Sequence, residues 1–152
     1  GASTITQQLA KMMFTEKPSR NNFERIKQKL KEWIIAVRLE SSYSKEEILT
    51  MYLNKFDFIY NAVGIRSAAE IYFNKDVKYL NLEEAALLIG MAKNPSLYNP
   101  RRFPDNALAR RNTVLYQMYR QRYMPFKSYD SLISKPIELS FNRKGHIHGI
   151  AT

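Results

Sequence analysis

Apolar residues recur three and four positions apart along most of the chain, which is the spacing of an amphipathic α-helix. This pattern predicts helices from about residue 4, from 23 to 39, from 44 to 54, up to 73, from 81 to 93, from 105 to 123 and near 128–133. Polar or proline-bracketed segments at 15–22 and 94–100 predict loops. We therefore expect a mainly α fold.

Helix starts are marked by short polar side chains. The capping-box pattern, in which such a residue precedes a Glu or Gln by three positions, occurs at Thr4 with Gln7, Ser44 with Glu47 and Asn81 with Glu84. Asp105 is the expected N-cap of the last long helix.

The helix at 23–39 has two distinct faces. Its apolar residues predict a stripe buried against the core, formed by Leu30, Trp33, Ile34 and Val37. The opposite face carries Arg25, Lys29 and Glu32, spaced four and three apart. From the pattern alone, a solvated face with a salt bridge is the simplest interpretation of these charges.

The C-terminal region differs from the rest. Ile137, Leu139 and Phe141 alternate with polar residues and predict either one short strand or an extended linker. His146 and His148 stand two residues apart with no cysteine or carboxylate close by in the sequence, so a linker is favoured over a metal site.

Composition narrows the class of protein. The chain has 152 residues, of which 45% are hydrophobic, enough for one folded domain. Its net charge of +10 favours anionic partners such as nucleic acid, anionic lipid or a phosphorylated substrate. The absence of cysteine excludes disulfides and thiolate metal sites, and no apolar run approaches the ~20 residues of a membrane span. Because the chain begins at Gly1, an upstream signal or anchor stays open.

Polar groups gather near the start of the first helix and after the helix that ends near residue 93. Gln7, Gln8 and Lys11 suit an anion or sugar hydroxyls near a helix N-terminus, although an ordinary polar face has the same pattern. Lys93 stands beside the loop at 94–100, where a cation also offsets the dipole of the helix C-terminus.

Four segments in order resemble glycosyltransferase family 51, the peptidoglycan glycosyltransferase (transglycosylase) domain of class A penicillin-binding proteins. Residues 1–11, GASTITQQLAK, resemble the signature GGSTITQQ followed by Lys, and residues 29–32 resemble the RKxxE segment. Residues 44–54 and 83–100 resemble the next two motifs. Gln28 departs from the RKxxE pattern by replacing its Arg.

This resemblance implies a lysozyme-like helical lobe with a small membrane-facing lobe. It implies polymerisation of lipid II into a growing glycan strand, with release of undecaprenyl diphosphate, at the extracytoplasmic face of the cell membrane. Residues 1–133 would be the C-terminal part of this domain, and residues 134–152 a linker toward a transpeptidase domain.

The resemblance also assigns roles. The family's general base is a Glu that precedes the GGSTITQQ motif, so we expect the 152-residue chain alone to be inactive. The second carboxylate corresponds to Glu32, acting at the donor diphosphate directly or through a divalent cation (Mg²⁺ or Mn²⁺). Matching the remaining motif positions predicts a cleft and diphosphate site formed by Ser3, Thr4, Gln8, Lys11, Lys29 and Lys93.

Other interpretations remain at this stage. A non-catalytic basic helical module that binds anionic membrane or nucleic acid explains the charge, and a muramidase-like hydrolase would also use a Glu. The ordered motifs favour the glycosyltransferase and argue against nucleic acid as the partner. Apolar side chains suited to a lipid-carried substrate, or equally to core packing, are Met12, Met13, Phe14, Phe56 and Phe58.

Overall fold

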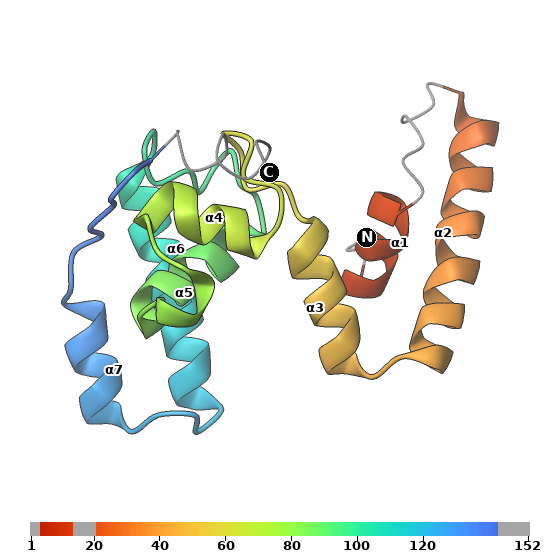
Figure 1. Ribbon diagram of the computed structural model, residues 1–152. Coiled ribbons are helices and arrows are strands. Elements are labelled where there is room, and N and C mark those ends of the chain that lie inside the picture. Colours follow the sequence, from red (N-terminus) through yellow and green to blue (C-terminus); the bar gives the residue numbers. More distant parts are fainter. Residues whose placement is uncertain (1–3, 14–20, 143–152) are drawn as a thin grey trace. The chain divides into compact units, whose positions relative to one another are not determined.

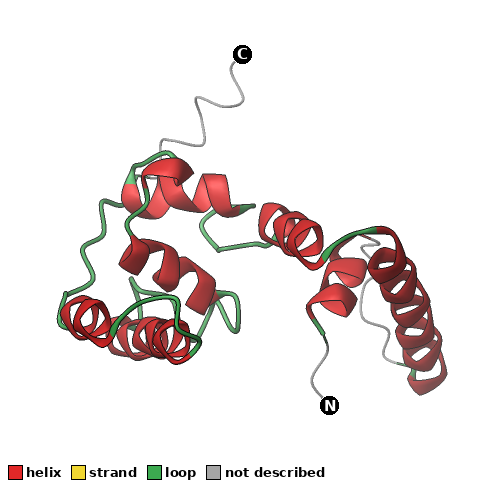
Figure 2. Cartoon of the chain, turned by 90° about the horizontal axis from the view of Figure 1, so that it is seen from below, coloured by secondary structure: helices red, strands yellow, loops and turns green. Residues whose placement is uncertain are grey.

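The computed structural model describes residues 4–13 and 21–142 (Figure 1). Contacts divide the chain into two compact units, unit 1 up to Phe56 and unit 2 from Asp57. In the described part of the chain every regular element is a helix, and Figure 2 accordingly draws helices and loops without a strand. The prediction of a mainly α fold is confirmed.

Unit 1 consists, within the described residues, of α1 (Ile5–Met13), α2 (Asn22–Ser42) and α3 (Lys45–Lys55). The short α1 packs against both α2 and α3. The predicted capping box of α3 is present, because the Ser44 hydroxyl accepts from the amide of Glu47 while the Glu47 carboxylate accepts from the amide of Ser44, each at 3.1 Å.

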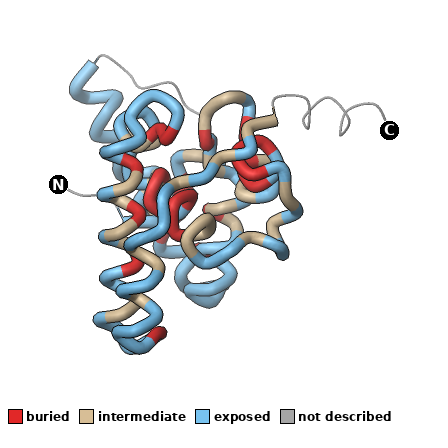
Figure 3. The backbone as a smooth tube through the Cα atoms, turned by 90° about the vertical axis from the view of Figure 1, so that its left-hand side faces the viewer, coloured by how far each residue is buried: buried red, intermediate tan, exposed pale blue. Residues whose placement is uncertain are grey.

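The buried face of α2 is not the one that the sequence predicted. Its buried residues are Ala36 and Leu39. The expected buried stripe is instead half exposed, with exposed fractions of 48–56% for Leu30, Trp33, Ile34 and Val37. The prediction was wrong because the packing of α1 and α3 against α2 buries the side that carries Ala36 and Leu39 and leaves the apolar stripe half exposed. Figure 3 colours the buried positions along the backbone.

Unit 2 begins with α4 (Ile65–Phe73) and a single 3-10 turn (Val77–Tyr79). It continues with α5 (Leu82–Met91), α6 (Pro104–Arg120) and α7 (Phe126–Ile133). Helix α5 is apolar along most of its length and packs against α4 and α6, while α7 packs against α6. The buried side chains of α5 include Leu87, Leu88 and Met91, so α5 is the central helix of this unit.

Helix boundaries in unit 2 follow the prediction with one correction. Asn81 and Glu84 form the expected capping box at the start of α5. The N-cap of α6 is Phe103, with no side-chain cap, and Asp105 lies in the first turn behind Pro104. Proline fits the first helical position because it lacks an amide hydrogen, which moves the helix start one residue before the polar residue that looked like a cap.

The alternating segment after α7 is extended but is not a strand in the described residues. The amides of Ser140 and Asn142 donate to the carbonyl oxygens of Tyr72 and Ile71, at 3.0 and 2.7 Å. The Phe141 ring packs edge-on against Tyr72, at 5.9 Å between ring centroids. This segment is therefore attached to the end of α4.

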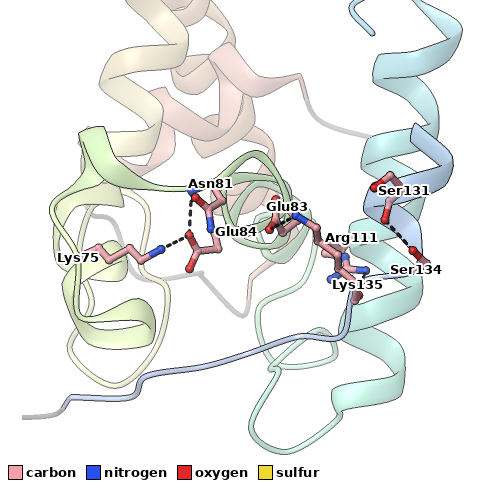
Figure 4. Close-up of polar contacts among 8 residues, drawn as sticks. All are labelled: Lys75, Asn81, Glu83, Glu84, Arg111, Ser131, Ser134 and Lys135. Atoms are coloured by element: carbon pink, nitrogen blue, oxygen red, sulfur yellow. Dashed lines mark hydrogen bonds and ion pairs between the residues drawn. The ribbon is translucent and has the colours of Figure 1, made fainter. Parts of the chain in front are cut away.

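Charged residues fasten the beginning of the same segment to α5 and α6 (Figure 4). The buried Arg111 donates through Nη2 to the carbonyl oxygen of Lys135 at 2.6 Å. The Lys135 ammonium in turn pairs with Glu83 at 3.4 Å. Burial lowers the pKa of Arg111, and the nearby Glu83 carboxylate opposes that shift. Hydrogen bonds satisfy this guanidinium inside the unit, as a buried charge requires.

Candidate functional site

Unit 1 contains every predicted site residue except Lys93. At its N-terminal end, the amide of Thr4 donates to Gln7 Oε1 at 3.0 Å, and the amide of Gln7 donates to the Thr4 hydroxyl at 3.1 Å. The capping box predicted at this position is therefore confirmed, and it fixes the start of α1. Ser3 lies outside the described residues, as do His146 and His148.

Three predicted substrate-binding residues share one face of α1. Thr4, Gln8 and Lys11 are spaced four and three apart, which places them on one side of a helix, and all three are exposed. The other side of α1 carries the fully buried Leu9 and Ala10. The helix thus presents a polar strip to its surroundings while its apolar side is held in the packing of unit 1.

Gln8 is joined to α3 by a contact that the sequence did not predict. The hydroxyl of Tyr52 donates to Gln8 Oε1 at 3.1 Å, across 44 positions in the chain. Tyr52 is 5% exposed, and its ring lies against Phe56 at 5.4 Å between centroids. Its spacing of four from the buried Ile48 indicated a core residue, but nothing local in the sequence identifies the partner of its hydroxyl.

The candidate carboxylate, Glu32, lies on the more buried side of α2. Its side chain is 17% exposed, whereas that of its ion-pair partner Lys29 is 65% exposed, with Nζ 3.3 Å from Oε2. On the same helix, the pair Glu24 and Lys27 is 51% and 60% exposed and spans 3.9 Å. The salt bridge expected at Glu32 is present, but the carboxylate itself is not on a fully solvated face.

Lys93 belongs to unit 2 and follows the C-terminal end of α5. It is exposed, and its amide donates to the carbonyl oxygen of Gly90 at 3.4 Å. The loop after it is organised by Asn94, whose carboxamide oxygen accepts from the amide of Leu97 at 3.1 Å. The cation therefore stands on a well-defined turn at a helix C-terminus.

The apolar residues considered for a lipid-carried substrate differ in how far they are exposed. Phe58 is fully buried in unit 2, so it has no access to a ligand. Met12 and Phe56 are half-buried, Met13 is 39% exposed, and Phe14 lies outside the described residues. Among the described residues of unit 1, exposed apolar side chains gather instead along one side of α2 (Phe23, Ile26, Leu30, Trp33, Ile34, Val37), which the sequence had predicted to be partly core.

A divalent cation would need several oxygen ligands in one place. Among the residues that the structure describes, no three carboxylate, histidine or cysteine side chains come together as a metal site. In the same part of the chain, no helix is both long and apolar enough to cross a membrane, and the 21-residue α2 is interrupted by charges.

Comparison with known proteins assigns the chain to a family. The family model described as Transglycosylase matches residues 1–119. Penicillin-binding protein 1A of Aquifex aeolicus is 38% identical over 144 residues, which is 95% of this chain and 19% of that protein. Penicillin-binding protein 1A of Escherichia coli is 41% identical over 142 residues, which is 93% of this chain and 16% of that protein.

A solved structure gives the same result for the fold. The crystal structure of penicillin-binding protein 1A from Haemophilus influenzae superposes with a TM-score of 0.60 at 31% identity, over 89% of this chain and 17% of that one. The chain thus spans less than a fifth of the length of these relatives. Sequence, fold and the order of motifs agree, and the chain belongs to the transglycosylase family.

Proposed function

We propose that the protein is a peptidoglycan glycosyltransferase that polymerises lipid II into glycan strands and releases undecaprenyl diphosphate. The observation that carries this proposal is the position of Glu32, which is largely buried, paired with Lys29, and on a helix that packs against α1, the helix with the polar strip. The family match supports the same reaction class. A non-catalytic basic module explains the net charge but not the ordered motifs, and it is not favoured.

The reaction joins the 4-hydroxyl of one sugar to the anomeric carbon of another. A general base removes the hydroxyl proton as the new bond forms, and inversion follows from attack opposite the leaving group. We assign the base to a glutamate that precedes the GASTITQQ segment in longer family members. Glu32 then assists at the donor side, where it orients the reactants and holds the Lys29 ammonium in place.

The leaving diphosphate departs as a stable anion, so it needs positive charge rather than a proton. We assign Lys11 and Lys29 of unit 1 to this charge, and Ser3, Thr4 and Gln8 to hydrogen bonds with the substrate. For Lys93 of unit 2, the same assignment rests on the family motif alone. The exposure of Lys11 supports its assignment, because an exposed ammonium remains able to meet a phosphate.

The exposed apolar stripe of α2 supports a membrane-associated site of action. Six large apolar side chains, 48–62% exposed, follow one side of this helix between Phe23 and Val37. A basic helix with such a face binds at the surface of an anionic bilayer, with its apolar side in the acyl region. We propose that this stripe faces the extracytoplasmic surface of the cell membrane, from which a lipid-linked substrate is delivered.

The remaining residues fit a multidomain protein. We propose that residues 1–133 form part of the catalytic domain and that residues 134–152 lead toward a transpeptidase domain. The relatives support this, since the chain matches only 16–19% of their length. The attachment of residues 140–142 to α4 would make the start of that linker rigid.

The decisive experiment compares Glu32→Gln with Glu24→Gln in a chain that also carries the general-base segment of longer family members. Glu24 provides a matched control because it forms a salt bridge at the same spacing on the same helix, but in solvent. We expect Glu32→Gln to lower the rate of lipid II polymerisation about 100-fold or more, a loss typical of a catalytic group, and Glu24→Gln to leave it unchanged. Equal activity of both variants would remove Glu32 from the site.

A further inference from the structure

The hydrogen bond between Tyr52 and Gln8 connects a buried side chain to an exposed one. The Tyr52 hydroxyl donates to the carboxamide oxygen of Gln8 at 3.1 Å. Gln8 lies on the polar strip of α1 with Thr4 and Lys11, whereas Tyr52 belongs to the buried side of α3. The contact therefore reaches from the packed interior of unit 1 to the surface that carries the predicted substrate-binding residues.

Tyr52 is a firm anchor. It is 5% exposed and its ring packs against Phe56. Burial raises the pKa of the Tyr52 hydroxyl above its ordinary value, so this group keeps its proton and remains a donor through the neutral and mildly alkaline range. A long glutamine side chain on a helix surface has several rotamers of similar energy, and a fixed donor selects among them.

The bond also orients the two ends of the carboxamide. A glutamine has an oxygen that accepts and a nitrogen that donates. Because the tyrosine hydroxyl donates to the oxygen, the bond fixes the orientation of the carboxamide and, with it, the direction of its N–H groups. Such donors match diphosphate oxygens and sugar hydroxyls, the groups that a lipid-linked sugar presents.

We propose that Tyr52 is a positioning residue, which holds the Gln8 carboxamide so that its N–H groups face the oxygens of the bound sugar diphosphate. This inference rests on the proposed function. Tyr52 need not touch the substrate itself. Its contribution is to remove the disorder of Gln8 before the substrate arrives, since a donor that is already oriented loses less entropy when it binds.

The test is a double-mutant cycle in the full-length chain, with Tyr52→Phe, Gln8→Ala and the double variant. Tyr52→Phe removes only the hydroxyl, and we expect kcat/KM for lipid II to fall about 3- to 10-fold, as for the loss of one hydrogen bond. In the Gln8→Ala background the same change should have no further effect, because its target is gone. A similar loss in both backgrounds, or no loss in the wild-type background, would overturn the proposal.

Tyr72→Phe is the matched control for general structural damage. Tyr72 is also buried and its hydroxyl donates to the backbone carbonyl of Phe58, but both residues belong to unit 2. We expect its effect on kcat/KM to be small and identical in the two Gln8 backgrounds. Dependence of the Tyr72→Phe effect on Gln8 would mean that the cycle reports folding rather than positioning.

Binding separates this proposal from the assigned reaction. The affinity of the same variants for lipid II in detergent micelles is measured without turnover. If the wild-type chain polymerises lipid II but the effects of Tyr52→Phe and Gln8→Ala are additive, the proposed function stands and the role of Tyr52 is refuted. Binding that shows coupling between the two residues, but no polymerisation in the wild-type chain, would support the positioning role and refute the function. A wild-type chain that neither binds nor polymerises lipid II would refute both.

Discussion

The two units of this chain bury their apolar residues to very different extents. In unit 2 a nearly all-apolar helix, α5, lies among its neighbours, and whole side chains such as Leu88 and Tyr72 are inaccessible to solvent. In unit 1 the short α1 is the main partner of a helix more than twice as long, and the apolar side of α2 stays half exposed. Unit 2 has the character of a scaffold, while unit 1 carries most predicted site residues and an uncovered apolar face.

This contrast is sharpest for one residue type in the two settings. Leu88→Ala empties a fully buried position and should lower the free energy of unfolding by about 2–5 kcal/mol. Leu30→Ala removes a side chain that is 53% exposed and should change it by about 0.5 kcal/mol or less. Urea denaturation of the 152-residue chain, followed by circular dichroism, measures both. Equal losses would show that the outer face of α2 is covered in solution.

The buried tyrosines offer a second comparison, through pH. Burial raises the pKa of Tyr72 strongly and that of Tyr52 as well, from an ordinary value of 10.0. Above pH 10 the unfolded chain therefore releases tyrosine protons that the folded chain retains, and stability falls as pH rises, by at most about 1.4 kcal/mol per pH unit for each group.

Replacing one tyrosine should flatten this decline, and Tyr72→Phe should flatten it more than Tyr52→Phe. Thermal melts between pH 8 and about 11 test the order. The exposed Tyr79 serves as a control, because it lies at the surface of unit 2 with 67% exposure. A decline that is unaltered in both buried variants would mean that other groups dominate alkaline unfolding.

The smallest expected difference concerns the helix caps, in which the two units are alike. Ser44 and Asn81 each begin a helix in a complete capping box, one in unit 1 and one in unit 2. Replacing either with Ala should cost about 1 kcal/mol, and each loss should appear in the transition of its own unit. Hydrogen exchange at the first turns of α3 and α5 would reveal a cap whose loss spreads to the other unit.

Local features of this fold were predictable because they depend on residues close in sequence. The three capping boxes and the pair between Lys29 and Glu32 all join residues three positions apart, and the structure contains each of them. Helix boundaries followed to within a few residues. The exception is the N-cap of α6, which is Phe103 and not Asp105, because Pro104 can begin a helix without a polar cap.

The covered face of α2 and the partner of Gln8 were not predictable in this way. Periodicity shows that α2 has an apolar and a charged side, but which side meets protein depends on the position and length of α1. The bond from Tyr52 joins residues 44 positions apart, so no local pattern contains it. The family signature predicted site residues on α1 and α2 as a group, and the packing of unit 1 places these two helices against each other.

The exposed apolar stripe of α2 also affects how strongly copies of the purified protein associate with one another. A net charge of +10 makes copies of the chain repel one another, while the stripe attracts them over a short range. In dilute salt the repulsion extends ~10–30 Å and keeps copies dispersed. In molar salt it shrinks to ~3 Å, and the stripes can then meet. We therefore expect ionic strength to control whether this protein stays in solution, unless a detergent or a bilayer already covers the apolar stripe of α2.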